Sequence, residues 1–459
     1  MTTTAIVNGV IVKSSGRTRA TLLIGEGRIQ AVLSPDQRPA ADTTIDADGR
    51  YIIPGVIDAH VHLAISQTFE DSCLSESRAA VTGGVTSMIH YLISGSSYFD
   101  VYEAHERAVN SHSLIDVAFH GLVTNDLQVA EIPRAVDELN ITSFKFHMAM
   151  KGVEAGYGIK GVDDGMMFEG MLQIASRAGV LALAHTENID VILRFRERMV
   201  RENPDSKDLS LWRKYRPAFT EEEAIVRCIK LAEAANVPFG VIHNSVGTGP
   251  RLLAEGKVRY PRLYMETCPQ FLLLNADMPL GTIGKMNPPL RFASDSDALW
   301  AAIANRQIDW MGSDHCDYDL ESKAGSIWEA GPGLVSGVQM ILPTLLDGVN
   351  KKKITLERLV AITSENTAKI FGFSPQKSTL DVGCDADLVI LDMDREVTID
   401  RETLNGFSPF TPYAGIKVKG WPRTTIVKGE VLYDRGQVND LTQHRGSVLR
   451  QDRLNPPNL

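Results

Sequence analysis

The chain has 459 residues, of which 44% are hydrophobic and 23% are charged, and its formal net charge is −10. This length exceeds one ordinary core and predicts a large domain with a smaller one. The acidic balance, without a long basic run, argues against nucleic acid or an anionic membrane as a partner. No run approaches the roughly 20 apolar residues of a membrane span, and no signal peptide is evident. Five scattered cysteines without a CxxC pair fit a reducing cytoplasm.

The residue pattern of 1–52 is typical of short strands joined by turns. Asn8-Gly9 separates the apolar runs Ala5–Val7 and Val10–Val12, and Asn-Gly in this position predicts a hairpin turn. Gly25-Glu26-Gly27 separates two further apolar runs and predicts a second hairpin. This segment is therefore predicted to form the N-terminal part of a small β domain.

Between residues 53 and 375, short apolar strands alternate with helical stretches such as Phe168–Ala178 and Glu221–Asn236. Strands that alternate with helices indicate βα units and a parallel sheet. With the apolar run Tyr51–Ile57 counted as the first strand, about eight such units predict an α/β fold, the (β/α)8 TIM barrel. The other strand candidates are Thr86–Tyr91, Val117–Leu122, Ser143–Ala149, Leu181–His185, Phe239–His243, Leu263–Glu266 and Trp310–Ser313.

Residues 376–440 again have a pattern typical of short strands. Leu388–Leu391, Thr424–Val427 and Glu430–Tyr433 are predicted strands, and the last two are predicted to form a hairpin. We expect these strands to pair with those of residues 1–52, so that both chain ends build one small β-sandwich domain beside the barrel. Residues 441–459 are predicted to form a tail, loose or exchanged from Arg450 onward.

The segment Asp58-Ala59-His60-Val61-His62 directly follows the first apolar run. Alternate side chains of a β-strand point the same way, so His60 and His62 are expected to aim both imidazoles at one point. That arrangement predicts a shared metal ion. A buried pair of hydrogen-bonded histidines is the alternative that these two residues alone leave open.

Other metal-competent side chains lie at the ends of later strands. They are Lys145, His185, His243 and Asp314. The C-terminal ends of barrel strands meet at one face, where active sites lie, so these residues are predicted to converge with the two histidines. Histidine and carboxylate ligands suit zinc and similar divalent ions. An ammonium group has only donors, so Lys145 becomes a bridging ligand only if its amine has added CO2 to form a carbamate.

With these residues in view, the chain resembles the amidohydrolase superfamily, and within it the cyclic amidase branch of hydantoinases, dihydropyrimidinases, allantoinases and dihydroorotases. The resemblance extends over nearly the whole chain. Its matching segments are Gly55–Leu63, Ala80–Thr86, Ser143–Lys145, His185–Asn188, Glu266–Gln270, Pro288–Arg291, Gly312–His315, Ser364–Lys369, Asp385–Val389 and Val418–Pro422. It implies the hydrolysis of a cyclic amide C–N bond.

The resemblance also implies the roles of the converging residues. The implied ligands are His60, His62 and Asp314 for one metal, His185 and His243 for a second, and carbamylated Lys145 with a hydroxide between the two ions. Zinc is the expected metal, and Glu187 is expected to orient a ligand. Asp314 would take the proton of the hydroxide and deliver it to the departing ring nitrogen. Opening of a hydantoin, dihydropyrimidine or related ureide would give an N-carbamoyl amino acid, and the family implies a homotetramer or dimer.

Several positions bear on which ring the site accepts. Hydantoinases and dihydropyrimidinases carry a Tyr that supports the oxyanion where this chain has Met150, and losing such a donor can cost roughly 10²–10³ in rate. Tyr157 is the expected stand-in. Ala64 replaces the Arg with which dihydroorotases bind a carboxylate, which disfavours dihydroorotate. Asn287 and the loop that ends at Gly337 are expected to contact the substrate ring.

Three alternatives stay open at this point. The missing Tyr favours an allantoinase as a variant of the same chemistry. A different specificity, toward a cyclic imide or in the manner of a deaminase, is the second alternative, although deaminase-like relatives often use one metal and no bridging Lys. The third is a non-catalytic scaffold related to dihydropyrimidinases, and the complete set of ligands argues against it.

Overall fold

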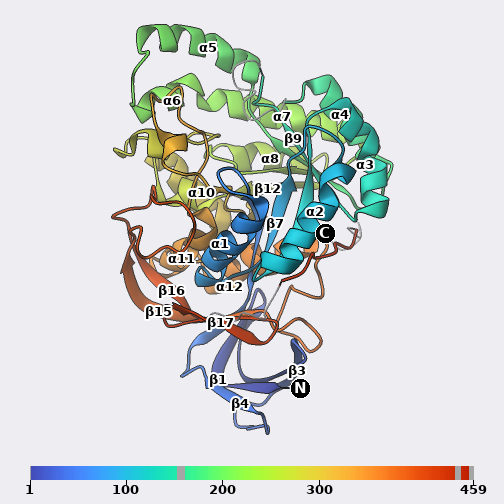
Figure 1. Ribbon diagram of the computed structural model, residues 1–459, viewed down its shortest axis with the longest axis vertical. Coiled ribbons are helices and arrows are strands. Elements are labelled where there is room, and N and C mark those ends of the chain that lie inside the picture. Colours follow the sequence, from blue (N-terminus) through green and yellow to red (C-terminus); the bar gives the residue numbers. More distant parts are fainter. Residues whose placement is uncertain (1, 152–160, 440–445, 454–459) are drawn as a thin grey trace.

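The computed structural model describes residues 2–151, 161–439 and 446–453 and contains two large sheets (Figure 1). The middle of the chain forms one sheet, which is surrounded by helices. The other sheet combines strands from both chain ends, drawn in blue and red in the lower part of Figure 1. The two ends of the sequence therefore meet below the barrel rather than forming separate units.

The central sheet is parallel and closes on itself. Its strands are β6 (Val56–His62), β7 (Val85–Leu92), β8 (Asp116–Val123), β9 (Ser143–His147), β10 (Leu181–His185), β11 (Phe239–Val241), β12 (Leu263–Thr267), β13 (Trp310–Met311) and β14 (His315–Cys316). β13 and β14 are two pieces of one chain segment, and they pair with β12 and β6, respectively. The nine described strands, with β13 and β14 counted once, thus occupy the eight positions of the predicted TIM barrel, which is confirmed.

Helices follow the barrel strands and cover the outside of the sheet. They are α1 (Phe69–Thr82), α2 (Tyr98–His112), α3 (Asp126–Glu138), α4 (Asp164–Ala175), α5 (Ile189–Glu202), α6 (Leu209–Tyr215), α7 (Ala218–Ala235), α8 (Gly249–Lys257), α9 (Pro269–Leu273), α10 (Ala293–Ala304), α11 (Gly337–Asn350), α12 (Leu356–Val360) and α13 (Asn366–Ile370), with the short turns η2 (Gly281–Gly284), η3 (Glu321–Lys323) and η4 (Ala361–Glu365). Polar residues fix several helix starts. The side chains of Thr68, Ser97 and Asn125 accept hydrogen bonds from first-turn N–H groups of α1, α2 and α3.

The second sheet joins the two chain ends. Its strands are β1 (Thr3–Lys13), β2 (Gly16–Gly25), β3 (Arg28–Leu33), β4 (Thr43–Asp46), β5 (Tyr51–Pro54), β15 (Leu388–Thr398), β16 (Lys417–Val427), β17 (Glu430–Asp434) and β18 (Gln437–Val438). The ends meet in the antiparallel pair β5–β15, where Ile53 is opposite Val389. Ile6, Leu22 and Leu388 belong to one buried apolar cluster, so the two ends share a core. The predicted small β domain from both chain ends is confirmed.

The predicted turn at Asn8-Gly9 is wrong. β1 continues through these residues to Lys13, and its register with β2 shifts between Ile6 and Gly9. Asn8 has a φ of 57°, so the Asn-Gly pair that suits a turn here makes a bulge inside one long strand. The second predicted hairpin is confirmed, since Gly25 pairs with Arg28 across the turn between β2 and β3.

The apolar run Tyr51–Ile57 is also not one strand. Its first part is β5 of the terminal sheet, and its second part begins β6 of the barrel. Gly55 lies at the crossing, where an added Cβ would be 2.0 Å from Oγ1 of Thr86. A glycine is therefore needed for the chain to pass this close to β7 on its way from one sheet to the other.

Residues 446–453 lie along the barrel. The N–H of Val117 donates to the carbonyl of Ser447 at 3.1 Å, and the N–H of Leu449 donates to the carbonyl of Val117 at 2.9 Å. The N–H of Asp452 donates to the carbonyl of Gly372 at 2.8 Å. The described part of the predicted tail is therefore hydrogen-bonded to the barrel domain, and residues 454–459 lie outside the described ranges.

A buried ionic cluster connects the start of β8 with the terminal sheet. Nζ of Lys377 lies 2.9 Å from Asp116, 3.0 Å from Asp385 and 2.6 Å from Asp387. Asp116 also lies 2.6 Å from Nζ of Lys428. Because each of the three carboxylates faces an ammonium group, the cluster balances much of its charge without solvent.

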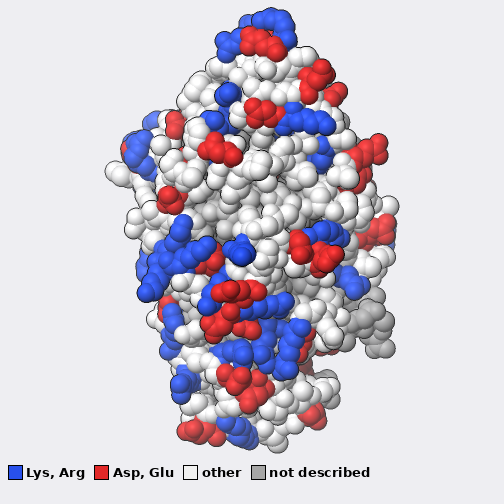
Figure 2. All heavy atoms as spheres, turned by 90° about the vertical axis from the view of Figure 1, so that its left-hand side faces the viewer, with Lys and Arg blue, Asp and Glu red and all other residues white. Residues whose placement is uncertain are grey.

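The outer surface carries charges of both signs. Figure 2 shows one face, on which Lys and Arg side chains are intermixed with Asp and Glu side chains over much of the area. Within the described ranges, no helix is both long and apolar enough to cross a membrane.

Candidate metal centre

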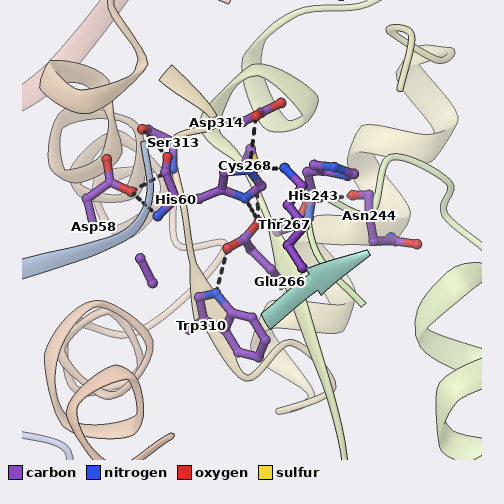
Figure 3. Close-up of polar contacts among 12 residues, drawn as sticks. Asp58, His60, His243, Asn244, Glu266, Thr267, Cys268, Trp310, Ser313 and Asp314 are labelled. Atoms are coloured by element: carbon purple, nitrogen blue, oxygen red, sulfur yellow. Dashed lines mark hydrogen bonds and ion pairs between the residues drawn. The ribbon is translucent and has the colours of Figure 1, made fainter. Parts of the chain in front are cut away.

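His60 and His62 end β6, and Asp314 lies in the interruption between β13 and β14. Nε2 of His60 is 3.3 Å from Nε2 of His62, and Oδ1 of Asp314 is 3.1 Å and 3.4 Å from these two nitrogens. Figure 3 shows Asp314 above the ring of His60. Both imidazoles point at one position, as the alternation along the strand predicts.

Lys145 reaches the same position from β9. Its Nζ lies 3.1 Å from Nε2 of His60 and 3.3 Å from Nε2 of His62. Burial lowers the pKa of this amine, while the carboxylates of Asp314 and Glu266 oppose that change. The surroundings of Lys145 therefore shift it toward the neutral amine, which is the form able to add CO2.

His185 ends β10 and His243 follows β11 on the same side of the barrel. The ring centroids of His185 and His243 are 4.5 Å apart, and those of His243 and His60 are 5.3 Å apart. Nε2 of His185 lies 2.7 Å from Oε2 of Glu187, so Glu187 orients this ring as expected. Both ring nitrogens of His243 are buried without a hydrogen-bond partner among the described residues. Such an arrangement costs free energy unless a further group binds there.

Glu266, in β12, contacts the ring of His60 and the backbone of His243 (Figure 3). Its Oε1 lies 2.7 Å from Nδ1 of His60 and accepts the backbone N–H of His243 at 2.7 Å. Its Oε2 accepts the indole N–H of Trp310 at 2.6 Å. With Nδ1 engaged, His60 presents Nε2 to the centre. Sequence reasoning did not assign Glu266 this role, although a carboxylate near the end of an apolar strand was the available signal.

Asp58 joins the first barrel strand to the last. It accepts the backbone N–H of His60 at 3.1 Å and that of Ser313 at 2.9 Å. Burial raises its pKa to about 6, against the effect of these hydrogen bonds. Asp58 thereby holds the two chain segments that carry His60 and Asp314 next to each other, a role that no sequence pattern indicates.

The donor set fits divalent metal ions. Two donors of a tetrahedral zinc ion at about 2.0–2.1 Å are about 3.3 Å apart, and Nε2 of His60 and Nε2 of His62 are 3.3 Å apart. The ligand atoms of His60, His62 and Asp314 all lie within 4.8 Å of one another. The unpartnered nitrogens of His243 are further candidates to face an ion. Imidazole and carboxylate groups are ligands that such ions prefer.

A cavity of ≈ 520 Å³ opens beside these residues. The predicted ligands in its wall are His62, Lys145, His185, His243 and Asp314. Apolar side chains, among them Leu63, Phe69 and Leu122, line much of the remaining surface. A cavity of this size accommodates a small ring with a substituent.

Not all of the predicted substrate contacts line this cavity. Asn287 lines it, and its Oδ1 is buried without a partner in the described part of the chain. Gly337 begins α11, where an added Cβ would lie 2.9 Å from the carbonyl oxygen of Ser313. Gly333, in the loop before Gly337, is a lining residue instead. Met150 also lines the cavity, and Tyr157 lies outside the described residues.

Comparison with known proteins agrees with this geometry. Residues 51–432 match the Amidohydrolase family. The L-hydantoinase of Paenarthrobacter aurescens is 32% identical, with 94% of this chain and 95% of that protein covered. The D-hydantoinase of Ralstonia pickettii is also 32% identical, with the same shares covered.

Solved structures show the same likeness. The crystal structure of dihydropyrimidinase from Brevibacillus agri has a TM-score of 0.89 and 29% identity and covers 99% of both chains. The L-hydantoinase (dihydropyrimidinase) from Arthrobacter aurescens has a TM-score of 0.90 and 31% identity, and it covers 98% of this chain and 100% of its own. The chain therefore belongs to the amidohydrolase family, in its cyclic amidase branch.

Proposed function

We propose that this protein hydrolyses a C–N bond of a five- or six-membered cyclic ureide and so opens the ring. The observation that carries the proposal is the approach of His60, His62, Lys145 and Asp314 to one point beside a cavity. Relatives that are 32% identical over 94% of the chain are named hydantoinases. Hydantoins are five-membered cyclic ureides, so the family and the site support the same chemistry.

The proposed centre contains two zinc ions. His60, His62 and Asp314 would hold one ion, His185 and His243 would hold the other, and a carbamate of Lys145 would serve as a ligand of both. The carbamate forms when the neutral amine adds CO2, which makes a new N–C bond and releases a proton. It replaces a donor-only ammonium by an anionic oxygen ligand. When bound, the ions supply Lewis acidity toward the ring carbonyl and lower the pKa of a water molecule.

Asp314 is the proposed proton carrier. Its side chain is 13% exposed and lines the cavity, so it can reach both the attacking water and the substrate. As the water oxygen bonds to the ring carbonyl carbon, Asp314 accepts a proton. The carbon–nitrogen bond then breaks, and Asp314 returns the proton to the departing nitrogen. The product is an N-carbamoyl amino acid whose new carboxylate contains the oxygen of the water.

Asn287 and the loop before α11 are the proposed contacts for the ring. The buried Oδ1 of Asn287, which no described group donates to, would accept a ring N–H. Within the loop, we assign the contact to Gly333 rather than Gly337, because Gly333 lines the cavity. Tyr157 stays a proposed donor to the oxyanion.

Allantoinase is the second candidate function. Met150 lines the cavity where the related enzymes carry a hydroxyl group, and a thioether cannot donate a hydrogen bond. A substrate that brings its own polar substituent, such as the ureido group of allantoin, depends less on that donor. This candidate uses the same ligands and the same proton carrier.

We also propose that the protein works as a homotetramer or dimer in the cytoplasm. The five cysteines are free and buried, which suits a reducing compartment. The oligomer is implied by the family, and light scattering coupled to size-exclusion chromatography measures it directly.

A ring-opening assay tests the function. Protein treated with zinc and bicarbonate is incubated separately with dihydrouracil, hydantoin, phenylhydantoin, allantoin, dihydroorotate and succinimide, and the Asp314→Asn variant serves as the control for contaminating activity. Turnover of a hydantoin or of dihydrouracil supports the first candidate, and turnover of allantoin alone supports the second. Binding of two metal ions per chain without turnover of any ring contradicts both.

A further inference from the structure

Lys323 is a buried lysine next to the cavity, outside the set of proposed ligands. It ends the short turn η3 and is 2% exposed. Its Nζ donates to three backbone carbonyl groups, those of Lys285 at 2.9 Å, Gly331 at 2.7 Å and Gly333 at 2.5 Å. Burial lowers the pKa of this amine to about 7. In its ammonium form it has three protons, and all three are donated to backbone oxygens.

The three carbonyl groups come from two separate segments of the cavity wall. Lys285 lies two residues before Asn287, which lines the cavity. Gly331 and Gly333 flank Pro332, and both Pro332 and Gly333 line it as well. One ammonium group therefore connects the two segments that carry the proposed contacts for the substrate ring.

The neighbourhood of Lys323 leaves little freedom for these segments. A Cβ at Gly333 would lie 2.0 Å from Cε2 of Tyr318, so the loop passes directly over that ring. Nζ of Lys323 lies 5.1 Å from the centroid of the same ring, within range of a cation–π interaction. On the other side, the indole N–H of Trp212 donates to the carbonyl of Met286 at 3.0 Å.

We propose that Lys323 is a positioning residue that sets the spacing of the two substrate-facing segments and thereby the affinity for the ring. The proposal rests on the proposed function for the identity of the ligand. The connection that Lys323 makes between the two segments does not depend on that function. Removal of the ammonium group leaves three carbonyl groups without their donor and frees the segments from each other.

The test compares Lys323→Met with Lys257→Met. Methionine keeps most of the apolar volume of the lysine stem and removes all three donors. Lys257 is the control because its ammonium pairs with Asp309, just before β13 at the other end of the barrel, at 3.2 Å. Hydrogen–deuterium exchange is measured on peptides covering 278–291 and 326–340, and KM and kcat are measured with the ring that the wild-type protein hydrolyses best.

We expect Lys323→Met to increase exchange in both peptides and to leave the barrel strands and the metal content unchanged. KM should rise about 10-fold or more and kcat should change less, because the two segments bind the ring and contribute no metal ligand. In an Asn287→Ala background, the same substitution should raise KM much less, since the contact it positions is already lost. Lys257→Met should alter neither peptide.

The outcomes separate this inference from the proposed function. Unchanged exchange in both peptides of Lys323→Met overturns the inference, whatever the activity of the protein. Increased exchange with unchanged KM also overturns it, because the spacing would then not matter for binding. If the wild-type protein hydrolyses none of the rings, the proposed function fails while the exchange measurement still decides whether Lys323 joins the segments.

Discussion

Lys145 and Lys377 are both buried lysines at polar clusters, but they lie at opposite ends of the barrel strands and have opposite surroundings. Lys377 is enclosed by Asp116, Asp385 and Asp387, and these carboxylates raise its pKa well above the usual range despite burial. Lys145 faces the imidazoles of His60 and His62, and burial lowers its pKa. The same side chain is thus held as a cation at one end and shifted toward the neutral amine at the other.

This difference distinguishes two groups of possible metal ligands among the described residues. Within the part of the chain that the structure describes, two groups of side chains have the spacing of metal ligands, namely His60, His62 and Asp314 at one end and the three aspartates at the other. Lys377 occupies the second group with its own ammonium, so no external cation is needed there. At the first group, burial lowers the pKa of the neighbouring Lys145, which disfavours its charged form beside the two imidazoles.

The largest expected effect is the loss of activity and of metal when Lys145 is replaced. Lys145→Ala should lower kcat/KM by about 10³-fold or more and remove one metal ion per chain, because the shared ligand is lost. Metal content is measured by mass spectrometry after gel filtration, with the exposed Lys151→Ala as the control. Two ions retained in Lys145→Ala would contradict the two-metal proposal.

Lys377→Met should act on stability instead. It leaves three buried carboxylates with less compensation and should lower the free energy of unfolding by about 3–5 kcal/mol, as loss of one partner of a buried ion pair does. Urea denaturation measures this change, and the exposed Lys352→Met should shift it by less than about 0.5 kcal/mol. Loss of metal from folded Lys377→Met would show that the two clusters are coupled, contrary to the comparison.

Met150→Tyr tests whether a hydroxyl group in the cavity wall beside Lys145 increases the rate, and it has the smallest expected effect. A hydroxyl group at this position should raise kcat for hydantoin about 10-fold by donating to the oxyanion. Met150→Phe has a similar volume without the hydroxyl group and should give no increase. Equal gains in both variants would assign the effect to packing, and a loss in both would indicate that the substrate occupies the space of Met150.

The sequence predicts the meeting of the ligands because their positions follow from strand geometry alone. His60, His62 and His185 end apolar runs, and parallel strands bring such ends to one face of a barrel. The four-part division of the chain and the assignment of individual ligands stay predictions. The orienting role of Glu187 followed from the motif and is seen in its contact with His185.

Other features could not be predicted, because they depend on close approaches between distant segments. The division of the run Tyr51–Ile57 at Gly55 reflects the space beside Thr86, which no local pattern reveals. An Asn-Gly pair suits both a bulge and a turn, and only the pairing of β1 with β2 shows that Asn8-Gly9 forms a bulge. The three hydrogen bonds of Nζ of Lys323 go to backbone oxygens, which carry no residue-type signal.

The interruption between β13 and β14 has a consequence for how the protein is made. Asp314 lies where the last barrel strand meets the first. Next to it, the backbone N–H of Ser313 donates to the carboxylate of Asp58, which is 255 residues away in the sequence. During synthesis, His60 and His62 emerge from the ribosome long before their carboxylate partner. The proposed centre, which includes Asp314, therefore cannot be complete on a nascent chain that ends before this residue, and its completion requires the last barrel strand to meet the first.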